Sequence, residues 1–341
     1  MPLLSQPQPV AAANLFWDGG IAMSAGQAMA PVNNAKKKKL WIQIWRNRQT
    51  YILLLPGLVW YAIFCYVPMG GLQLAFKKFN AGIGILKSPW IGLTNYQFVI
   101  QDTAFFRALA NTFIISGSKL LFVFPVAIVL ALLINELRTG RYKQTLQTIF
   151  TFPHFLSWVI VASVMLGLLG SDGAINNIIY AITGDTADKI PFLGNPRIFR
   201  PILYITDAWK SAGWSSIIYL ATIASIDVEQ YEAAIIDGAT RFQRMWHITL
   251  PGIKTTIIVL FILACGSMMD AGFDQIFNLN NAAVRDVSDI LDTYIYRITF
   301  QTAADFGFST AISLMKAVAN FILLVFADRM AKLAGETGLF A

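Results

Sequence analysis

Residues 120–134 read LLFVFPVAIVLALLI, a run that contains no charged side chain. Two further stretches, Trp158–Gly170 and Thr256–Met269, are also free of charge. Each lies in an apolar or small-residue window of the roughly 20 residues that an α-helix needs to cross a bilayer. These stretches therefore predict helices that span a membrane rather than helices of a soluble core.

The composition of the whole chain agrees with a membrane protein. Of its 341 residues, 56% are hydrophobic and 13% are charged, a balance that water-soluble folds of this length rarely have. The net charge of +7 does not indicate a nucleic-acid partner, because many lysines and arginines flank the apolar stretches, where membrane topology accounts for them. We expect an all-α integral membrane protein with about six transmembrane helices.

Apolar windows and the residues around them define the expected topology. Residues 1–35 have neither the basic start nor the continuous apolar stretch of a signal peptide, so we expect a mobile tail. Lys36–Lys39, followed by Trp41 and Trp45, are typical of a segment that lies against anionic headgroups on the cytoplasmic side. The expected spans are residues 51–76, 111–135, 146–170, 201–225, 253–275 and 307–330.

An even number of spans returns the carboxyl terminus to the cytoplasm. We therefore expect a cytoplasmic tail and interfacial segment over residues 1–50 and a multi-pass domain of the cytoplasmic (inner) membrane over residues 51–341. The loops on the outer side, roughly 77–110, 171–200 and 276–306, are too short for a sizeable receptor domain. Capture of a ligand on that side would then be weak or be delegated to another chain.

The longest loop expected in the cytoplasm covers residues 226–252. Asp227, with Gln230 three residues later, predicts a capping box that starts a helix. Good helix formers continue to Ile236, and Gly238 provides the flexible backbone of a helix end. A short second helix is expected to end at His247, before Pro251 opens the next span.

Two interpretations of the first helix in this loop are open from its composition. Ala233 and Ala234 keep one helical face thin, which permits close approach of a partner, and Glu232 and Asp237 place charge at its margin. The alternative is an ordinary amphipathic helix on the membrane surface, and composition alone favours that alternative.

The spacing from Glu232-Ala-Ala through Gly238 to Ile248-x-Leu250-Pro251 resembles the signature of permeases of binding-protein-dependent ABC importers, at every fixed position. The resemblance continues through Gly92-Leu-Thr-Asn-Tyr96, Phe105 and Asn111-Thr112, and covers nearly everything from residue 50 onward. It implies the architecture of an ABC type I importer permease, in which this loop carries the coupling helix seated in a groove of the ATPase. The residues that it implies for coupling are Glu232, Ala233, Ala234, Asp237, Gly238, Ile248, Leu250 and Pro251. Val228 departs from the family, where many relatives have proline.

The resemblance also implies partners and a cargo. A second permease subunit, two ATP-binding cassette subunits, an extracytoplasmic solute-binding protein and membrane lipid are expected, with an oligosaccharide as substrate. Within the family, the chain is similar to the first permease subunit of an alginate oligosaccharide importer, which implies an acidic sugar. ATP and magnesium would be used by the partner ATPases. The chain itself has no phosphate loop, since Gly117-Ser-Lys119 lacks the preceding glycine and the following hydroxyl residue, so we expect neither enzyme activity nor a bound cofactor.

Ionisable residues within spans are costly and are therefore candidates for the substrate pathway. Asp207 and Lys210 are three residues apart and can share one face of the fourth span, and Asp270 and Asp274 are four apart in the fifth. Sugar hydroxyls need charged or amide partners, lysines can offset acidic groups, and sugar rings stack on aromatic side chains. The pathway candidates are Lys119, Asp207, Trp209, Lys210, Trp214, Asp270, Phe273, Asp274 and Lys316.

Each pathway candidate also has a structural interpretation. Asp207 and Lys210 would form an ion pair near the outer interface, and the tryptophans would belong to an interfacial belt. Lys119 and Lys316 would extend toward the interface or bind the second permease. The sequence leaves these alternatives open.

Two other function classes remain in view. An ion-coupled secondary transporter or channel would use intramembrane aspartates for ion coupling. A membrane enzyme acting on glycolipids would need catalytic carboxylates at an interface, for which Asp286, Asp289 and Asp292 are the nearest candidates. No metal site is expected, because His154 and His247 are far apart and have no carboxylate or cysteine at ligand spacing. Cys65 and Cys265 lie in apolar segments and do not indicate a disulfide framework.

Overall fold

A computed structural model describes residues 42–43, 45–138, 140–185, 189–302, 304–336 and 338–340. The expected tail over residues 1–35, the run Lys36–Lys39 and Trp41 lie outside the described residues. The described chain consists of helices and connecting segments, and the one β-bridge recorded in it joins Lys77 to Trp90. Contacts divide the chain into two compact units, Met1–Pro68 and Met69–Ala341.

The first unit contains the start of an apolar helical run. It holds α2 (Arg48–Tyr61), η1 (Ala62–Tyr66) and the first residues of α3 (Val67–Met69), and the run then passes into the second unit as η2 (Gly70–Phe76). No residue of α2 is buried, although most of its side chains are apolar. Exposed apolar side chains on a continuous helix suit a lipid environment. The helix confirms the first expected span.

Four helical segments in the described parts of the chain are long and apolar enough to cross a membrane: Arg48–Phe76, Thr103–Asn135, Trp158–Thr183 and Phe306–Leu333. The bent pair Arg241–Gly252 and Lys254–Gly266 makes a fifth if it is counted as one span. The expected fourth span corresponds to α10 (Pro196–Ile223), whose 28 residues suffice in length. It is less apolar than the other segments because it carries charged and hydroxyl side chains. The helical membrane fold is confirmed, and the count of six stays a prediction.

The third span was expected as one helix over residues 146–170, and this is wrong. Helix α7 (Arg141–Thr151) ends before the 3-10 turn η3 (Phe152–Phe155), and α8 (Trp158–Leu169) begins after an extended residue. Pro153 has no N–H to donate, and the Ser157 hydroxyl accepts the N–H of Ile160 at 3.3 Å as a new N-cap. Helix α9 (Ala174–Thr183) then continues the apolar segment that starts with α8.

The fifth span was expected as one helix over residues 253–275, and it is also broken. Helix α14 (Lys254–Gly266) is followed by the turn η6 (Met268–Asp270) and by α15 (Phe273–Leu279). Between η6 and α15, Ala271 and Gly272 have φ values of 45° and 87°, in the left-handed region that ends a right-handed helix. We call residues 268–272 the bend. Because the bend separates them, Asp270 and Asp274 do not share one helical face, contrary to the expectation.

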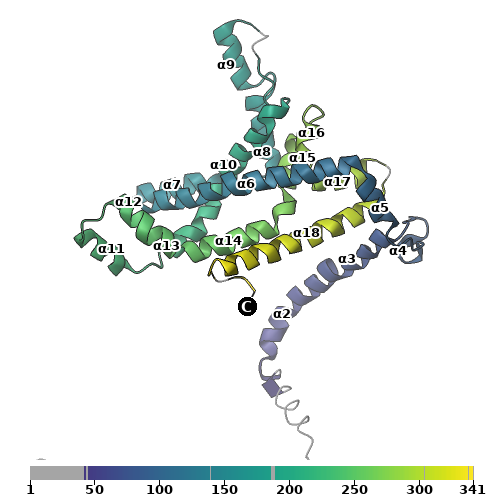
Figure 1. Ribbon diagram of the computed structural model, residues 1–341, viewed down its shortest axis with the longest axis horizontal. Coiled ribbons are helices and arrows are strands. Elements are labelled where there is room, and N and C mark those ends of the chain that lie inside the picture. The colour runs from purple at the N-terminus through teal and green to yellow at the C-terminus, as the bar shows by residue number, and fades with distance from the viewer. Residues whose placement is uncertain are drawn as a thin grey trace, which may run out of the picture. The chain divides into compact units, whose positions relative to one another are not determined.

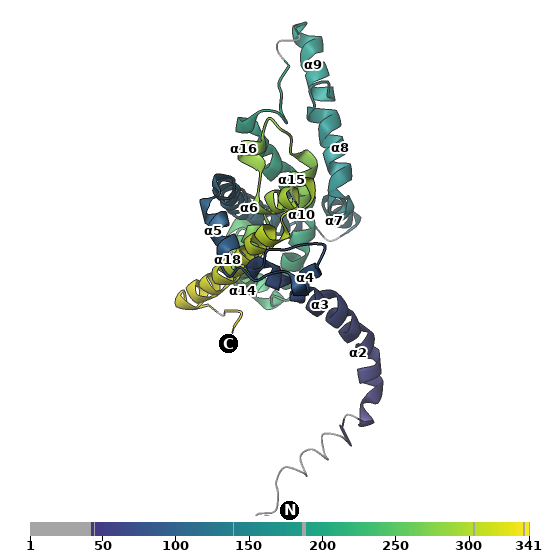
Figure 2. The ribbon, with the colours of Figure 1, turned by 90° about the vertical axis from the view of Figure 1, so that its right-hand side faces the viewer.

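In the second unit, α6 (Thr103–Asn135) packs along α10, and α14 packs along α18 (Phe306–Leu333), as Figures 1 and 2 show. Helices α8 and α9 lead away from these four helices in both views. Helix α7 approaches α10 so closely that a Cβ on Gly213 would lie 2.0 Å from the carbonyl oxygen of Phe150. The remaining elements are α4 (Gly84–Lys87), α5 (Thr94–Gln101), α11 (Val228–Ile236), α12 (Arg241–Arg244), η5 (Met245–Thr249), α13 (Leu250–Gly252), α16 (Arg285–Ser288), α17 (Leu291–Tyr296) and η7 (Arg297–Gln301).

Candidate functional site

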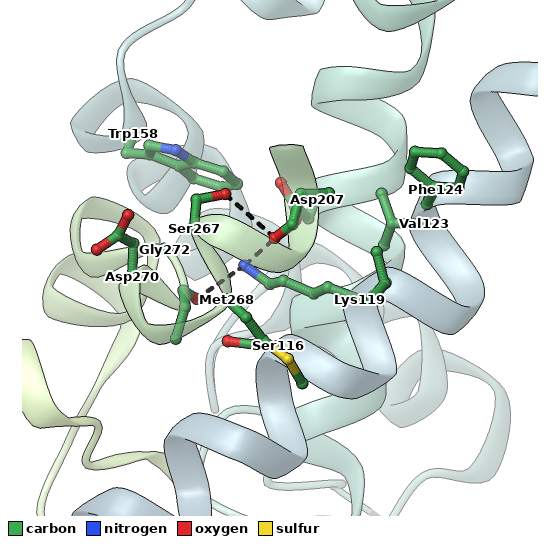
Figure 3. A pocket seen from close by; sticks show the side chains of 13 residues that line it. Ser116, Lys119, Val123, Phe124, Trp158, Asp207, Ser267, Met268, Asp270 and Gly272 are labelled. Atoms are coloured by element: carbon green, nitrogen blue, oxygen red, sulfur yellow. Dashed lines mark hydrogen bonds and ion pairs between the residues drawn. The ribbon is translucent and has the colours of Figure 1, made fainter. Parts of the chain in front are cut away.

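A pocket of about 440 Å3 opens where α6, α8 and α10 meet the bend of the fifth span (Figure 3). It brings together three of the nine pathway candidates, Lys119, Asp207 and Asp270, from three different segments. The other lining residues are Ser116, Leu120, Val123, Phe124, Trp158, Ala264, Ser267, Met268, Ala271 and Gly272. Apolar walls with a few convergent polar groups are typical of a binding site for a small molecule.

Lys119 ties the second span to the bend. Its Nζ donates to the carbonyl oxygen of Ala271 at 3.1 Å and to Oε1 of Gln275 at 2.7 Å. The same ammonium lies 3.2 Å from the carboxylate of Asp207 on α10, in an ion pair that is largely shielded from solvent. Gly272 suits the left-handed backbone of the bend, and a Cβ there would lie 2.6 Å from Nζ and displace the ammonium from its present position.

Gln275 extends this polar cluster into the protein interior, and it was not among the expected site residues. Its side chain is fully buried, and its Nε2 donates to the carbonyl oxygen of Leu203 at 2.8 Å and to Oγ1 of Thr206 at 2.9 Å. A polar amide just beyond an apolar run was the available signal, because buried amides need partners on neighbouring helices. The amide thus joins α15 to α10 beneath the pocket.

The opposite side of the bend is held by α18. The Nζ atom of Lys316 lies 2.8 Å from the carboxylate of Asp270 and 2.6 Å from that of Asp292, which is on α17. Four residues further along α18, Oδ1 of Asn320 accepts the backbone N–H of Met269 at 2.9 Å. The bend therefore has polar contacts with α6 and α18, and the lysines that make them also pair with Asp207 on α10 and Asp292 on α17.

Asp207 and Lys210 do not form the ion pair that their spacing allowed. Asp207 pairs with Lys119 and accepts the hydroxyl of Ser211 at 3.1 Å. Lys210 is buried and donates to the carbonyl oxygen of His154 at 2.7 Å, with its Nζ 5.5 Å from the centroid of the Trp158 ring. Asp207 and Lys210 therefore have different partners.

The aromatic candidates have separate environments. Trp214 stacks on the His154 ring with centroids 4.7 Å apart and lines a neighbouring pocket of about 300 Å3 with Phe124. Trp209 is half exposed and does not line the Lys119 pocket. Phe273 packs against Phe277 and Tyr296. Two aromatic side chains line the Lys119 pocket, Phe124 and Trp158, and neither was among the expected site residues.

The remaining acidic candidate, Asp274, is exposed in the first turn of α15, where its carboxylate complements the positive end of the helix. It does not line the Lys119 pocket. Neither Asp274 nor Phe273 therefore joins the polar cluster at the bend.

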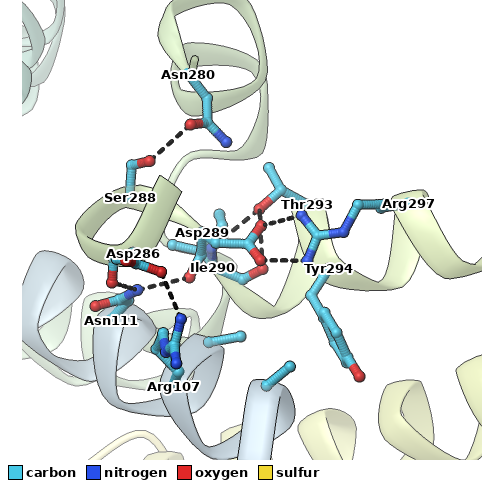
Figure 4. A network of polar contacts seen from close by, with 12 residues as sticks. Arg107, Asn111, Asn280, Asp286, Ser288, Asp289, Ile290, Thr293, Tyr294 and Arg297 are labelled. Atoms are coloured by element: carbon cyan, nitrogen blue, oxygen red, sulfur yellow. Dashed lines mark hydrogen bonds and ion pairs between the residues drawn. The ribbon is translucent and has the colours of Figure 1, made fainter. Parts of the chain in front are cut away.

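The acidic stretch before η7 forms a network of contacts within the fold (Figure 4). Buried Asp289 receives both guanidinium nitrogens of Arg297 and the hydroxyl of Thr293, the latter at 2.8 Å. Asp286 instead pairs with Arg107, and Asp292 pairs with Lys316. The three carboxylates thus have three different cationic partners, an arrangement that gives no support to a shared catalytic centre. In the described ranges, no three His, Cys, Asp or Glu residues group as metal ligands.

Asn111 on α6 holds this acidic segment in place. Its amide nitrogen donates to the carbonyl oxygens of Asp286 and Asp289, both at 3.0 Å, and its Oδ1 accepts from Arg200 at 2.7 Å. The neighbouring Thr112 accepts the backbone N–H of Leu291 at 2.9 Å. The Asn111-Thr112 motif therefore has a positioning role.

Loop 226–252 has the two-helix form expected for it, with different ends. Asp227 caps α11 through the N–H of Glu229 at 3.0 Å, rather than through the expected box with Gln230. Gly238 has a φ of +79° just past the end of α11, as expected for a helix stop, and its N–H donates to the carbonyl of Ile235.

The second helix of the loop runs past His247, where it was expected to end. Thr240 and Gln243 form a capping box, and α12, η5 and α13 continue to Gly252. The axis then turns by 58° into α14. Pro251 is accommodated in the first turn of α13, where no donor is needed from it. The hydroxyls of Tyr231 and Thr249, 3.0 Å apart, join the two helices.

Side chains on the loop divide into an exposed group and a packed group. Ile236, Phe242 and Trp246 are 86%, 64% and 56% exposed. Leu250 packs against a core cluster that includes Tyr219 and Ile253. Among the residues implied for coupling, Glu232, Ala233, Asp237, Gly238 and Pro251 are exposed, and Ala234, Ile248 and Leu250 are partly buried.

Comparison with known proteins assigns the family. The family described as "Binding-protein-dependent transport system inner membrane component" matches residues 123–334. Protein LplB of Bacillus subtilis (strain 168) is 44% identical over 313 residues, which cover 91% of this chain and 97% of that protein. The polygalacturonan/rhamnogalacturonan transport system permease protein YteP of the same organism is 41% identical over 324 residues, covering 93% and 100%.

A solved structure shares the fold over most of the chain. It is a bacterial alginate ABC transporter in complex with an alginate pentasaccharide-bound periplasmic protein, and the matching chain has a TM-score of 0.79 and 39% identity. The match covers 88% of this chain and 100% of that one. The agreement of family, sequence and fold shows that this chain belongs to the binding-protein-dependent transport system inner membrane components, as the permease subunit of a sugar ABC importer, without an ATPase of its own.

Proposed function

We propose that this permease moves oligosaccharides through the Lys119 pocket and that loop 226–252 couples this movement to separate ATPase subunits. The observation that carries the proposal is continuity of the chain from the loop to the pocket. Helix α13 ends the loop, α14 follows after one residue, and α14 leads to the bend that lines the pocket. A displacement of the loop is therefore transmitted along one helix to the pocket wall.

The exposed side of the loop supports the role as a docking surface. Ile236, Phe242 and Trp246 present apolar area, with Glu232 and Asp237 beside them. Partly apolar surfaces rimmed by charge are typical of protein interfaces. The partners we propose are two ATP-binding cassette subunits, which bind ATP and magnesium, a second permease and an extracytoplasmic solute-binding protein.

Transport would proceed by alternating access. A loaded solute-binding protein docks on the outer side, closure of the ATPases moves loop 226–252, and the 58° junction before α14 passes this movement to the bend. This requires both termini and residues 1–50 on the cytoplasmic side and residues 51–341 as the transmembrane domain of the inner membrane, which are part of the proposal.

The chemistry of the pocket supports a sugar as cargo. Asp207 and Asp270 offer carboxylate acceptors, Ser116 and Ser267 offer hydroxyls, and Trp158 offers an aromatic face. Acidic alginate-type oligosaccharides and neutral oligosaccharides are the cargo classes to compare.

An ion-coupled secondary transporter or channel is less well supported. The aspartates of the pocket each lie against a lysine, so each carboxylate already has a cationic partner in place of a coupling ion. The test is uptake of labelled oligosaccharide into proteoliposomes that contain this chain, its partner permease, the ATPases and the solute-binding protein. Uptake that requires ATP and the binding protein supports the importer. Uptake driven by an ion gradient without nucleotide contradicts it.

A further inference from the structure

The lysines around the pocket are already committed to partners within the protein. An ammonium group has three hydrogens to donate, and Lys119 has three acceptors, in Asp207, Ala271 and Gln275. Lys210 is buried with the His154 carbonyl as its acceptor and does not line the pocket. No lysine in the lining therefore has a free donor for a carboxylate group of a cargo.

The carboxylates of the pocket lining differ from its lysine in their capacity for further hydrogen bonds. With Lys316 and Asp292, which adjoin Asp270, the lining holds three aspartates and two lysines, so the cluster has one formal negative charge in excess. Asp207 is mostly covered, but 59% of the Asp270 side chain is exposed at the edge of the pocket, apart from the Lys119–Asp207 pair (Figure 3). One oxygen of Asp270 faces Lys316, and a carboxylate can accept from several donors at once. Asp270 therefore retains capacity to accept a hydroxyl group from the pocket side.

Asp292 is a second carboxylate partner of Lys316, so Lys316 stays paired when Asp270 accepts a hydroxyl group. Asp292 lies 2.6 Å from Nζ of Lys316, and its side chain is only 21% exposed. When a hydroxyl donor draws Asp270 toward the pocket, Lys316 keeps Asp292 as its counter-ion. The lysine is never left buried without a partner, a situation that would cost several kcal/mol.

We infer that Asp270, positioned by Lys316 and Asp292, is the acceptor for cargo hydroxyl groups and that the pocket selects neutral sugar units over uronic acids. This inference deepens the proposed function and rests on it. A sugar hydroxyl donates to Asp270 and gains a hydrogen bond to a charged group. A uronate carboxylate meets aspartates and finds no uncommitted ammonium, and juxtaposed like charges are a strong means of rejection.

The experiment measures uptake of neutral and uronate oligosaccharides of equal length by the complete reconstituted complex. The binding constants of the solute-binding protein for both sugars are measured first, and uptake is then compared at saturating loading. The variants are Asp270→Asn and, as a matched control, Asp274→Asn, which removes the same charge from an exposed carboxylate just past the bend that does not line the pocket. Both variants are quantified in the assembled complex.

We expect the wild-type complex to import the neutral sugar at least tenfold faster than the uronate. Asp270→Asn lowers neutral uptake about tenfold, the effect of weakening one hydrogen bond to a charged group, and does not lower uronate uptake. Asp274→Asn changes the neutral rate by less than threefold. Equal wild-type rates, a binding protein that accepts uronates alone, or equal effects of the two variants would overturn the inference. If no sugar stimulates ATP-dependent uptake, the importer function on which the inference rests is itself refuted.

Discussion

Replacement of Lys119 by methionine would remove the cation that connects α6, α10 and the bend. The substitution nearly preserves the length of the side chain but leaves the Asp207 carboxylate, which is only 18% exposed, without its counter-ion. It also leaves Oε1 of buried Gln275 and the carbonyl oxygen of Ala271 without this donor.

The magnitude follows from the burial of the pair. Breaking a buried ion pair by removing one partner costs about 3–5 kcal/mol, because the remaining charge is uncompensated. With Lys119 only 13% exposed, we expect Lys119→Met to lower the free energy of unfolding by about 3–5 kcal/mol. The double variant Lys119→Met/Asp207→Asn removes the orphaned charge, and we expect it to recover about 2 kcal/mol of that loss.

The assay is equilibrium unfolding of the purified permease complex in mixed detergent micelles. Arg107→Met provides a control, since Arg107 and Asp286 are 58% and 79% exposed in their pair, and exposed pairs contribute roughly 0–1 kcal/mol. If Lys119→Met costs no more than this control, or if the two substitutions at the buried pair add without coupling, the bend does not depend on the Lys119–Asp207 pair.

Two further predictions concern packing and the acidic segment. Gly213→Ala places a Cβ 2.0 Å from the Phe150 carbonyl oxygen, so we expect a loss of about 1–3 kcal/mol in the same unfolding assay; Gly57→Ala, which meets nothing within 4 Å, should be neutral or stabilising. Asn111→Ala removes two donated hydrogen bonds and the acceptor of Arg200, so hydrogen exchange of residues 286–291 should quicken; unchanged exchange there would contradict the positioning role of Asn111.

The helical membrane fold was predictable from sequence because apolar runs of spanning length leave few alternatives. The breaks within the third and fifth apolar segments were not predictable from sequence. Pro153 and the Ser157 cap divide the third apolar segment, and the left-handed pair Ala271 and Gly272 divides the fifth, yet hydropathy averages over such positions. A proline or glycine in a span is compatible with a bend or with a straight helix, and neighbouring helices decide which one forms.

The candidate site was predictable by residue type and not by pairing. Spacing along one helix placed Asp207 beside Lys210, but the partner of Asp207 comes from α6 and that of Lys210 from η3. Periodicity reports which residues share a face and carries no information on the helix that covers this face. Lys119, Asp270 and Lys316 were identified because intramembrane charge is rare, whereas Gln275 is uncharged and was missed.

Loop 226–252 was predicted more closely because its signals are local. The cap at Asp227 and the left-handed stop at Gly238 depend on neighbouring residues in the chain, and both form. The second helix extends past His247 because Pro251 begins a new turn there without the need to donate a hydrogen bond.

The measurement that tests coupling most directly is ATP hydrolysis by the reconstituted complex with sugar-loaded solute-binding protein, for Gly238→Trp and Gly335→Trp. Both glycines have left-handed backbones past a helix end, with φ of +79° and +81° and no atom within 4 Å of an added Cβ. The backbone strain, about 1–2 kcal/mol, is therefore matched, and only Gly238 belongs to the loop. We predict that Gly238→Trp abolishes the stimulation of hydrolysis by loaded binding protein and that Gly335→Trp retains it. Full stimulation in an assembled Gly238→Trp complex would contradict the role of loop 226–252 in coupling.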